Sequence, residues 1–150
     1  MTHASPAVTQ AWIDLARTYG AILTDIEAAL AKADLPPLTW YDILWEAERA
    51  GDAGLRQVEL ERALLLKQYN VSRLIDRIEA AGLIARRPCP EDARAKRIVL
   101  THDGRAMRDR MWMIYGPRLD SLVGDALGEA DSATLSALLT RLRNHVRTSD

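Results

Sequence analysis

Apolar side chains recur at spacings of three and four residues over two stretches near the start of the chain, which is the pattern of amphipathic helices. The first stretch, Ala7–Ala33, is followed by Leu35-Pro36-Pro37, where the prolines stop a helix. The second stretch, Leu38–Ala50, ends in the glycine-containing run of residues 51–54. The sequence therefore predicts two consecutive helices with a short break between them.

The middle of the chain predicts two shorter helices followed by a hairpin. The ranges Gln57–Leu64 and Lys67–Ala81 read as a helix-turn-helix, and Gly82 is a natural terminator for the second helix. The ranges Leu83–Arg87 and Lys96–Leu100 are short β-strand candidates, joined by a proline-rich loop that is too long for a two-residue turn. A helix-turn-helix followed by a hairpin is a winged helix.

The last third of the chain is again predicted to be helical. Thr101 suits the N-cap of a long helix that runs toward Leu127, and Gly116-Pro117 predicts a kink within it. A last helix, Ser132–Arg147, carries a continuous apolar stripe. The fold class is therefore mainly α: a winged helix-turn-helix with a small β-hairpin wing and a helical dimerisation region formed by the N- and C-terminal helices.

This pattern divides the chain into three regions of one intertwined domain. Residues 1–37 are the N-terminal dimerisation helix, residues 38–100 the winged helix-turn-helix region, and residues 101–150 the C-terminal dimerisation helices. A homodimer is expected because a first helix of about 25 residues is longer than a compact single core needs. Two recognition helices one DNA turn apart also need a rigid two-fold connection. The alternative is that the apolar stripes close a monomeric core.

Charge is distributed unevenly, although the chain of 150 residues has a net charge of only -1. From Leu55 to Leu100 there are ten Lys and Arg against six Asp and Glu, which gives +4, and the remainder has ten against fifteen, which gives -5. A basic middle between acidic flanks indicates a module that binds a polyanion, carried on a scaffold with another role. Double-stranded DNA is the partner that a winged helix predicts.

The outward face of the second helix of the pair supplies candidates for DNA contacts. Apolar positions 71, 74, 75 and 78 share one face, and the polar side chains fall away from it. An arginine can read guanine with two parallel hydrogen bonds, and Arg73 is the first choice for that role. The further candidates for bases or phosphates are Gln68, Asn70, Ser72 and Arg77. Taken alone, such a face also fits a solvated helix surface.

The loop of the predicted hairpin carries cations at its tip. Arg94, Lys96 and Arg97 can lie along the DNA backbone and place an arginine in the narrow minor groove. A charged surface loop without a partner is the other interpretation. The combination of helix pair, hairpin and local charge excess favours DNA.

Three segments of this region form a specific combination: NVSRLIDRIEAAGLIAR at residues 70–86, PEDAR at 90–94 and VLTHDG at 99–104. In this combination the chain resembles the MarR family of bacterial transcription regulators. The resemblance implies a winged-helix homodimer in which the first, fifth and sixth helices dimerise and Arg94 of each wing enters a minor groove. It also implies a repressor, less often an activator, that a small ligand or an oxidant releases from DNA.

Arg77 has two possible roles, which the sequence leaves open. It can contact DNA, or it can pair with Asp92 and brace the wing against the recognition helix.

Aromatic side chains gather on the first, second and fifth predicted helices. The resemblance places a ligand cleft among those helices and implies aromatic acids as effectors. The candidate pocket residues are Trp12, Tyr19, Trp40, Tyr41, Trp45, Trp112 and Tyr115. The alternative is that these aromatic residues serve packing alone.

Cys89 is the only thiol of the chain and lies between Pro88 and Pro90. Arginines near it would lower the pKa of its thiol, which is how reactive cysteines are tuned. Relatives that sense peroxide resemble one another in a cysteine on the first helix, which this chain lacks. The sequence therefore predicts an incidental, exposed cysteine.

No enzyme is predicted, because the three histidines lie far apart and no HExxH, P-loop or GxGxxG motif occurs. No catalytic residue, metal site or cofactor is expected, and no apolar run of membrane-spanning length or signal segment is present, so the expected location is the cytoplasm. The rival function is a winged helix that contacts an acidic protein without specific DNA binding. The sequence names neither the regulated genes nor the effector.

Overall fold

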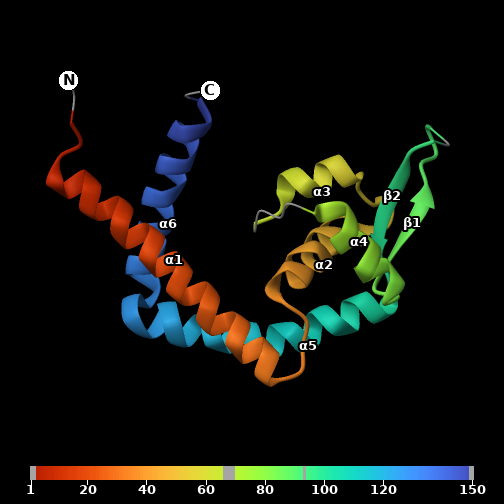
Figure 1. Ribbon diagram of the computed structural model, residues 1–150, viewed down its shortest axis with the longest axis horizontal. Coiled ribbons are helices and arrows are strands. Elements are labelled where there is room, and N and C mark those ends of the chain that lie inside the picture. The colour runs from red at the N-terminus through yellow and green to blue at the C-terminus, as the bar shows by residue number, and fades with distance from the viewer. Residues whose placement is uncertain (1–2, 66–69, 93, 149–150) are drawn as a thin grey trace. The chain divides into compact units, whose positions relative to one another are not determined.

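The two predicted N-terminal helices form in the computed structural model, which describes residues 3–65, 70–92 and 94–148 (Figure 1). The first helix, α1 (Pro6–Lys32), is followed by Asp34 in the left-handed conformation, and the Leu35 N–H closes the end by donating to the Leu30 carbonyl at 3.0 Å. The second helix, α2 (Leu38–Ala50), has the predicted bounds. Its first N–H, that of Leu38, donates to Glu27 Oε1 at 2.9 Å, which ties α2 to the end of α1.

The helix-turn-helix consists of α3 (Gln57–Ala63) and α4 (Val71–Ala80). The Glu59 side chain accepts a hydrogen bond from the Arg56 N–H at 2.8 Å, which satisfies one donor at the start of α3. The predicted second helix began at Lys67, and residues 66–69 lie outside the described part of the chain.

The predicted hairpin is present as β1 (Ile84–Pro88) and β2 (Lys96–Leu100), which pair antiparallel. A short 3-10 turn, η1 (Gly51–Ala53), leads from α2 to Leu55, which exchanges two backbone hydrogen bonds with Ile98 of β2. Gly54, between them, has φ 68°, and a Cβ there would lie 2.7 Å from the Ile98 carbonyl oxygen. Glycine is needed at this position for both reasons.

The apolar core joins the helix-turn-helix, α2 and the hairpin. Ile75 and Ile78 of α4 are fully buried, and Val71 and Leu74 pack against the same cluster, so the predicted apolar face of α4 is confirmed. The other buried members come from α2, α3, β1, β2 and the segments between them: Ile43, Leu44, Ala47, Leu55, Leu60, Leu83, Ile84 and Ile98. This core holds α4 in place and leaves its polar face exposed.

The start of α5 (His102–Leu119) is fixed against the turn that follows α4. Thr101 accepts a hydrogen bond from the Gly104 N–H at 3.0 Å, as predicted for an N-cap, and its hydroxyl donates to the Gly82 carbonyl at 2.7 Å. Gly104 lies so close to the chain that an added Cβ would be 1.9 Å from the Leu83 carbonyl oxygen. The hairpin and α5 are therefore joined by a contact that only glycine allows.

Beyond Pro117, next to which the sequence predicts a kink, the helix is irregular. Helix α5 continues through the proline to Leu119, and a π-helical turn, η2 (Asp120–Gly124), follows it. Inside α6 (Asp125–Thr148) the non-helical residue is Gly128, with φ 66°, next to the predicted helix end at Leu127. The glycine breaks the helix because it alone adopts this conformation without strain.

The chain consists of two compact units, residues 27–114 and residues 1–26 with 115–150. The second unit contains the Asp25–Arg118 ion pair between α1 and α5, in which Arg118 Nη2 donates to Asp25 Oδ2 at 2.7 Å. Its helices also expose large apolar side chains: Val8, Trp12, Tyr19, Leu135, Leu138, Leu142 and Val146. No helix within the described residues has the length and apolar character needed to span a membrane.

Replacing Gly104 by alanine tests the junction between the hairpin and α5. The added methyl group meets a backbone carbonyl, which cannot rotate away, so we expect a loss of about 2 to 3 kcal/mol in the free energy of unfolding. The control is Gly20→Ala in α1, where an added Cβ meets nothing within 4 Å and helix propensity predicts a neutral or stabilising effect. Urea denaturation of both variants measures the difference, and equal stability would show that the junction is not strained.

Candidate nucleic-acid interface

The exposed face of α4 carries the predicted contact residues. Ser72, Arg73 and Arg77 are exposed, and Asn70 is exposed at the N-cap position, while Gln68 lies outside the described residues. In the described part of the chain, no carboxylate lies within ion-pair distance of Arg73 or Arg77. Both guanidinium groups are therefore available to a partner outside the chain.

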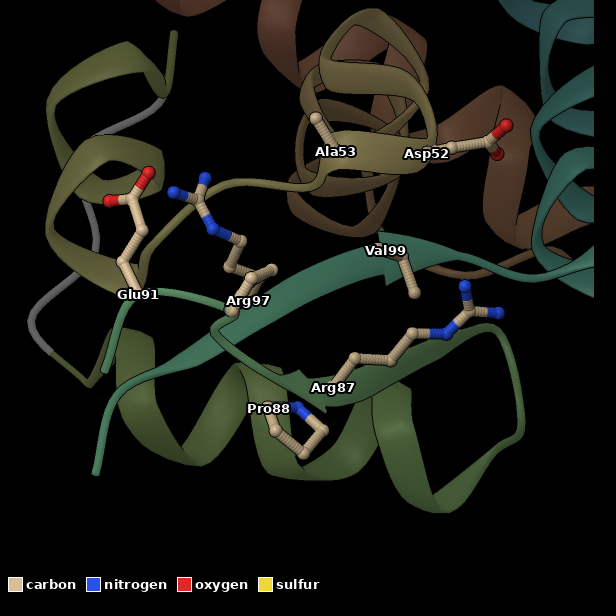
Figure 2. A pocket seen from close by; sticks show the side chains of 8 residues that line it. Asp52, Ala53, Arg87, Pro88, Glu91, Arg97 and Val99 are labelled. Carbon is tan, nitrogen blue, oxygen red and sulfur yellow. The ribbon is translucent and has the colours of Figure 1, made fainter. Parts of the chain in front are cut away.

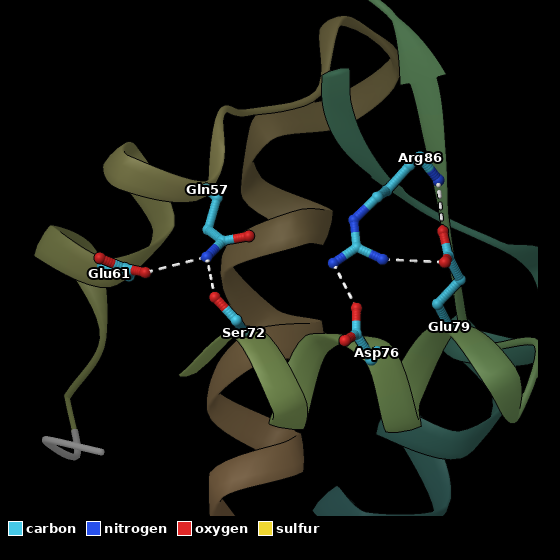
Figure 3. A network of polar contacts seen from close by, with 6 residues as sticks. All are labelled: Gln57, Glu61, Ser72, Asp76, Glu79 and Arg86. Carbon is cyan, nitrogen blue, oxygen red and sulfur yellow. Dashed lines mark hydrogen bonds and ion pairs between the residues drawn. The ribbon is translucent and has the colours of Figure 1, made fainter. Parts of the chain in front are cut away.

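Ser72 is held by a residue of α3 that the sequence did not indicate as part of the site. Gln57 Nε2 donates to Ser72 Oγ at 2.6 Å and to Glu61 Oε1 at 3.1 Å (Figure 3). Because Ser72 accepts this bond, its own hydroxyl proton remains free to be donated to a phosphate or a base. Gln57 and Ser72 are fifteen residues apart, so no spacing rule within one helix predicts the contact.

The wing is braced to α4 by Arg86 of β1. Its Nη1 lies 2.8 Å from Glu79 Oε1, its Nη2 lies 2.8 Å from Asp76 Oδ1, and its backbone N–H donates to Glu79 Oε2 at 3.2 Å (Figure 3). The Arg86 side chain is only 21% exposed, so this is a partly buried, charge-assisted network. It fixes the hairpin against the recognition helix.

The Arg77–Asp92 brace, one of the two roles that the sequence leaves open for Arg77, is not found, since no ion pair joins these two residues in the described structure. Asp92 instead shapes the tip of the wing, where its Oδ1 accepts the Arg94 N–H at 2.9 Å and its carbonyl accepts the Ala95 N–H at 3.1 Å. The carboxylates that face β1 come from α4 itself, at positions 76 and 79. An acidic pair three residues apart on an otherwise basic helix was the signal that could have indicated Arg86 as their partner.

The tip of the wing carries the three cations that the sequence indicated as candidates for DNA contacts. Arg94 and Lys96 are exposed and Arg97 is half-buried, and none of the three has a carboxylate within ion-pair distance in the described part of the chain. The loop is closed at its base by the Cys89 N–H, which donates to the Ala95 carbonyl at 3.0 Å. Arg94 therefore lies on the loop between the strands, and Lys96 and Arg97 lie at the start of β2.

Cys89 is buried, with 3% of its surface exposed, so the expectation of an exposed cysteine was wrong. The thiol lies beside the Glu91 backbone and the Arg97 guanidinium. The Glu91 N–H and the Arg97 guanidinium stabilise the thiolate and lower the pKa of Cys89.

The two sides of the hairpin differ in what they face. Arg86 faces α4, while Arg87 and Arg97 line a hollow of about 360 Å³ on the side of η1 (Figure 2). The other lining residues are Asp52, Ala53, Pro88, Pro90, Glu91 and Val99. The sequence did not indicate this hollow, because it depends on the register of the two strands.

Part of the predicted aromatic pocket forms a cluster between α2 and α5. The Tyr41 ring stacks with Trp45 at 6.5 Å and with Trp112 at 6.0 Å between centroids, and the Arg108 guanidinium lies 5.0 Å from the Trp45 centroid. Trp40 packs against the core of the winged helix instead. Trp12, Tyr19 and Tyr115 belong to the unit of residues 1–26 and 115–150.

Glu48 pairs with Arg108 of this aromatic cluster and with one further arginine of α5, Arg105. Its Oε1 lies 3.1 Å from Arg105 Nη1 and its Oε2 lies 2.5 Å from Arg108 Nε. The cluster therefore offers rings and cations, the groups that bind an aromatic anion.

Among the described residues, no three His, Cys, Asp or Glu lie close enough to hold a metal ion.

Comparison with known proteins gives a family and a fold. Residues 33–95 match the family model described as MarR family, which confirms the resemblance there. AbsC, a MarR family transcriptional regulator from Streptomyces coelicolor, superposes with a TM-score of 0.83 at 22% identity, covering 99% of each chain. Sco3205, from the same organism and in complex with DNA, has a TM-score of 0.85 at 18% identity, covering 97% of this chain and 91% of its own.

A third similar structure is a mutant of MarR from E. coli complexed with operator DNA. It has a TM-score of 0.77 at 21% identity and covers 94% of this chain and 99% of its own. At these identities the superpositions establish the winged-helix fold.

Replacing Arg86 by alanine tests the brace. Removing it breaks two ion pairs, but Asp76 and Glu79 are partly exposed and can be solvated, so we expect a loss of only about 1 to 2 kcal/mol in the free energy of unfolding. The control is Arg49→Ala, which removes an exposed guanidinium whose contact with Glu46 is long, at 3.4 Å, and is expected to cost under about 0.5 kcal/mol. Thermal and urea denaturation compare the two variants. Equal losses would contradict the role of Arg86 as a brace.

Proposed function

We propose that this chain, whose residues 33–95 place it in the MarR family, is a DNA-binding transcriptional regulator that reads a pseudo-palindromic operator as a homodimer. The observation that carries the proposal is the set of exposed cations without carboxylate partners, in the described residues, on both α4 and the wing. These two elements are held together by Arg86, so they are offered to a partner as one surface. A regulator of this kind acts in the cytoplasm, where the DNA is.

The two elements suit different grooves of DNA. An α-helix fits the major groove, where Arg73 reads a guanine edge and Ser72, Asn70 and Gln68 contact bases or phosphates near the start of the helix. The wing reaches the adjacent minor groove with Arg94, and Lys96 and Arg97 lie along the backbone. Arg77, which has no ion pair with Asp92, takes the DNA-contact role of the two that the sequence left open.

The homodimer is supported by the exposed apolar side chains of α1 and α6. Trp12 and Tyr19 of α1 and a stripe of Leu135, Leu138 and Leu142 on α6 are too exposed for a monomer core. Burying such a surface in a second copy stabilises the pair and gives two recognition helices a two-fold relation. The proposed dimerisation helices lie in residues 1–37 and 101–150.

A small aromatic acid is the proposed effector, and the protein is a repressor that this ligand releases. Trp112 is 46% exposed, and Arg105 next to the cluster is also exposed, so a ring can stack on the indole while a carboxylate pairs with the guanidinium. The proposed pocket extends over Tyr41 and Trp45, and Trp40 is its remaining candidate within residues 27–114. Release requires that the ligand bind more tightly to the protein conformation that does not fit DNA.

Arg73→Ala tests the assignment of base reading against that of backbone contact. We expect the variant to lose about 1 to 3 kcal/mol of discrimination between operator and random DNA, because the bidentate contact to guanine is lost. Arg94→Ala is the matched contrast, and it should weaken binding. It should also reduce the steepness of log affinity against log salt concentration by about one per protomer. The operator is first selected from a random-sequence library, and binding is measured by fluorescence anisotropy. Equal losses for Arg73→Ala on operator and random DNA would contradict base reading.

The effector proposal is tested with Trp112→Leu and Trp112→Phe. A panel of aromatic carboxylates is screened for release of the wild-type protein from operator DNA, with cyclohexanecarboxylate as the non-aromatic control. We expect Trp112→Leu to lose sensitivity to the active ligand by about tenfold or more, and Trp112→Phe to retain most of it, because a stacking contact is worth about 0.5 to 1.5 kcal/mol beyond its area. A response in Trp112→Leu equal to that of the wild type would place the ligand elsewhere.

A further inference from the structure

A single amide group connects α3 to the start of α4. Gln57 of α3 is half-buried, and its Nε2 lies 2.6 Å from Ser72 Oγ and 3.1 Å from Glu61 Oε1. Figure 3 shows both contacts made by the nitrogen, while the amide oxygen of Gln57 points away from them. The side chains of Gln57, Glu61 and Ser72 therefore form one polar network at the end of the recognition helix.

Glu61 determines which end of the amide faces Ser72. A carboxylate accepts hydrogen bonds and donates none, so the amide atom beside it has to be the NH2 nitrogen. Turning the amide over would place its oxygen against the carboxylate, where two acceptors repel each other. Because the same nitrogen contacts Ser72, its second hydrogen is directed at the Ser72 oxygen. Ser72 is thus held as an acceptor within the protein.

This arrangement favours one role for Ser72 toward a partner outside the chain. Its side chain is exposed in the first turn of α4, next to Arg73. The bond from Gln57 occupies one lone pair of the hydroxyl oxygen and polarises the hydroxyl, which makes it a stronger donor. If Ser72 accepted a second bond from a base, its own hydrogen would be left without a partner in a desolvated interface. Ser72 is therefore set to donate.

The four bases differ in what they offer to such a donor. In the major groove, guanine presents acceptors at N7 and O6, adenine presents an acceptor at N7, and thymine presents one at O4. Cytosine presents only its N4 amino group, which is itself a donor. A serine held as a donor therefore tolerates the other bases and rejects cytosine on the strand that it faces.

We propose that the polar network makes Ser72 a hydrogen-bond donor to a base edge and so selects against cytosine at one operator position. This inference rests on the proposed function and adds Gln57 and Glu61 as positioning residues, which act through Ser72. The network complements Arg73, because a bidentate arginine selects one base, whereas a single donor excludes one.

The test is the ranking of four operators that differ only at the base pair that Ser72 faces. Fluorescence anisotropy on all single-base variants of the operator locates this position as the one whose preference changes in Ser72→Ala. We expect the wild type to bind the cytosine operator about threefold to tenfold more weakly than the best of the four, because one hydrogen bond is lost, and Ser72→Ala to lose this difference. An equal loss for Ser72→Ala on every operator would indicate a phosphate contact and overturn the proposal.

Gln57→Glu separates a positioning role from a structural one, because it reverses the hydrogen bond. A carboxylate at position 57 can only accept, so it takes the Ser72 hydrogen and leaves lone pairs toward the DNA. Its charge should weaken binding to every operator, but this factor cancels in the ranking, where we expect the penalty on cytosine to disappear. Unchanged discrimination against cytosine in Gln57→Glu would overturn the proposal.

Gln57→Met is the second variant, because it removes the amide without placing a new charge beside Glu61. It leaves the Ser72 hydroxyl free to rotate, so the penalty on cytosine should fall. In the Ser72→Ala background, neither substitution at position 57 should change the ranking, since both act through Ser72. A further change in that background would show that Gln57 acts by another route, which contradicts the proposal.

The matched control is Gln10→Met on α1. It removes the same kind of contact, between Gln10 Nε2 and Asp14 Oδ1 at 2.9 Å, from the unit of residues 1–26 and 115–150. Its operator ranking should equal that of the wild type, and a change as large as that in Gln57→Met would overturn the proposal. Failure of the proposed function is distinct, because the wild type would then prefer no sequence at any position.

Discussion

The interaction of Arg86 with Asp76 and Glu79 is the constraint on which the proposed DNA-binding surface depends. A recognition helix and a wing reach different grooves of DNA, so their relative position has to be fixed before either can be specific. Apolar contacts from Ile75, Ile78 and Ile98 hold the two elements together, but the hydrophobic effect is non-directional and does not fix their relative orientation. The guanidinium adds direction, because its planar fork fits two carboxylates on one face of α4 only when β1 lies at one angle. It also neutralises the acidic charge of α4, which would otherwise repel phosphate.

Pairing between acidic residues and arginines also determines which charges the winged helix presents to its surroundings. Glu79, Asp76 and Glu48 are each paired with an arginine within the chain, so they contribute little net field outside it. Arg73, Arg77 and Arg94 have no such partner among the described residues. A chain whose net charge is close to zero can therefore present a basic surface, because the acidic residues of α4 are paired with Arg86.

Features that depend on local periodicity could be predicted from the sequence, and features that depend on register could not. The bounds of α2 and β2, the apolar face of α4 and the N-cap at Thr101 all follow from spacing or from single residue types. The brace at Arg86, the opposition of Arg87 and Arg97, and the Gln57–Ser72 contact need the three-dimensional pairing of segments. The burial of Cys89 has the same origin, since a loop of prolines and charges looks exposed until its fold is known. The helix end predicted near Leu127 lies next to Gly128, because glycine supplies the left-handed conformation that breaks the helix.

The central claim is that the exposed cations of α4 and the wing select a DNA sequence. The most direct measurement is the affinity of the purified full chain for the DNA upstream of its own gene, with random duplex as competitor, over a salt series. The account predicts a preference for the upstream DNA that survives near physiological salt, together with an affinity that falls steeply as salt increases. Equal affinity for both duplexes at every salt concentration would contradict it, and would favour an acidic protein as the partner of this surface.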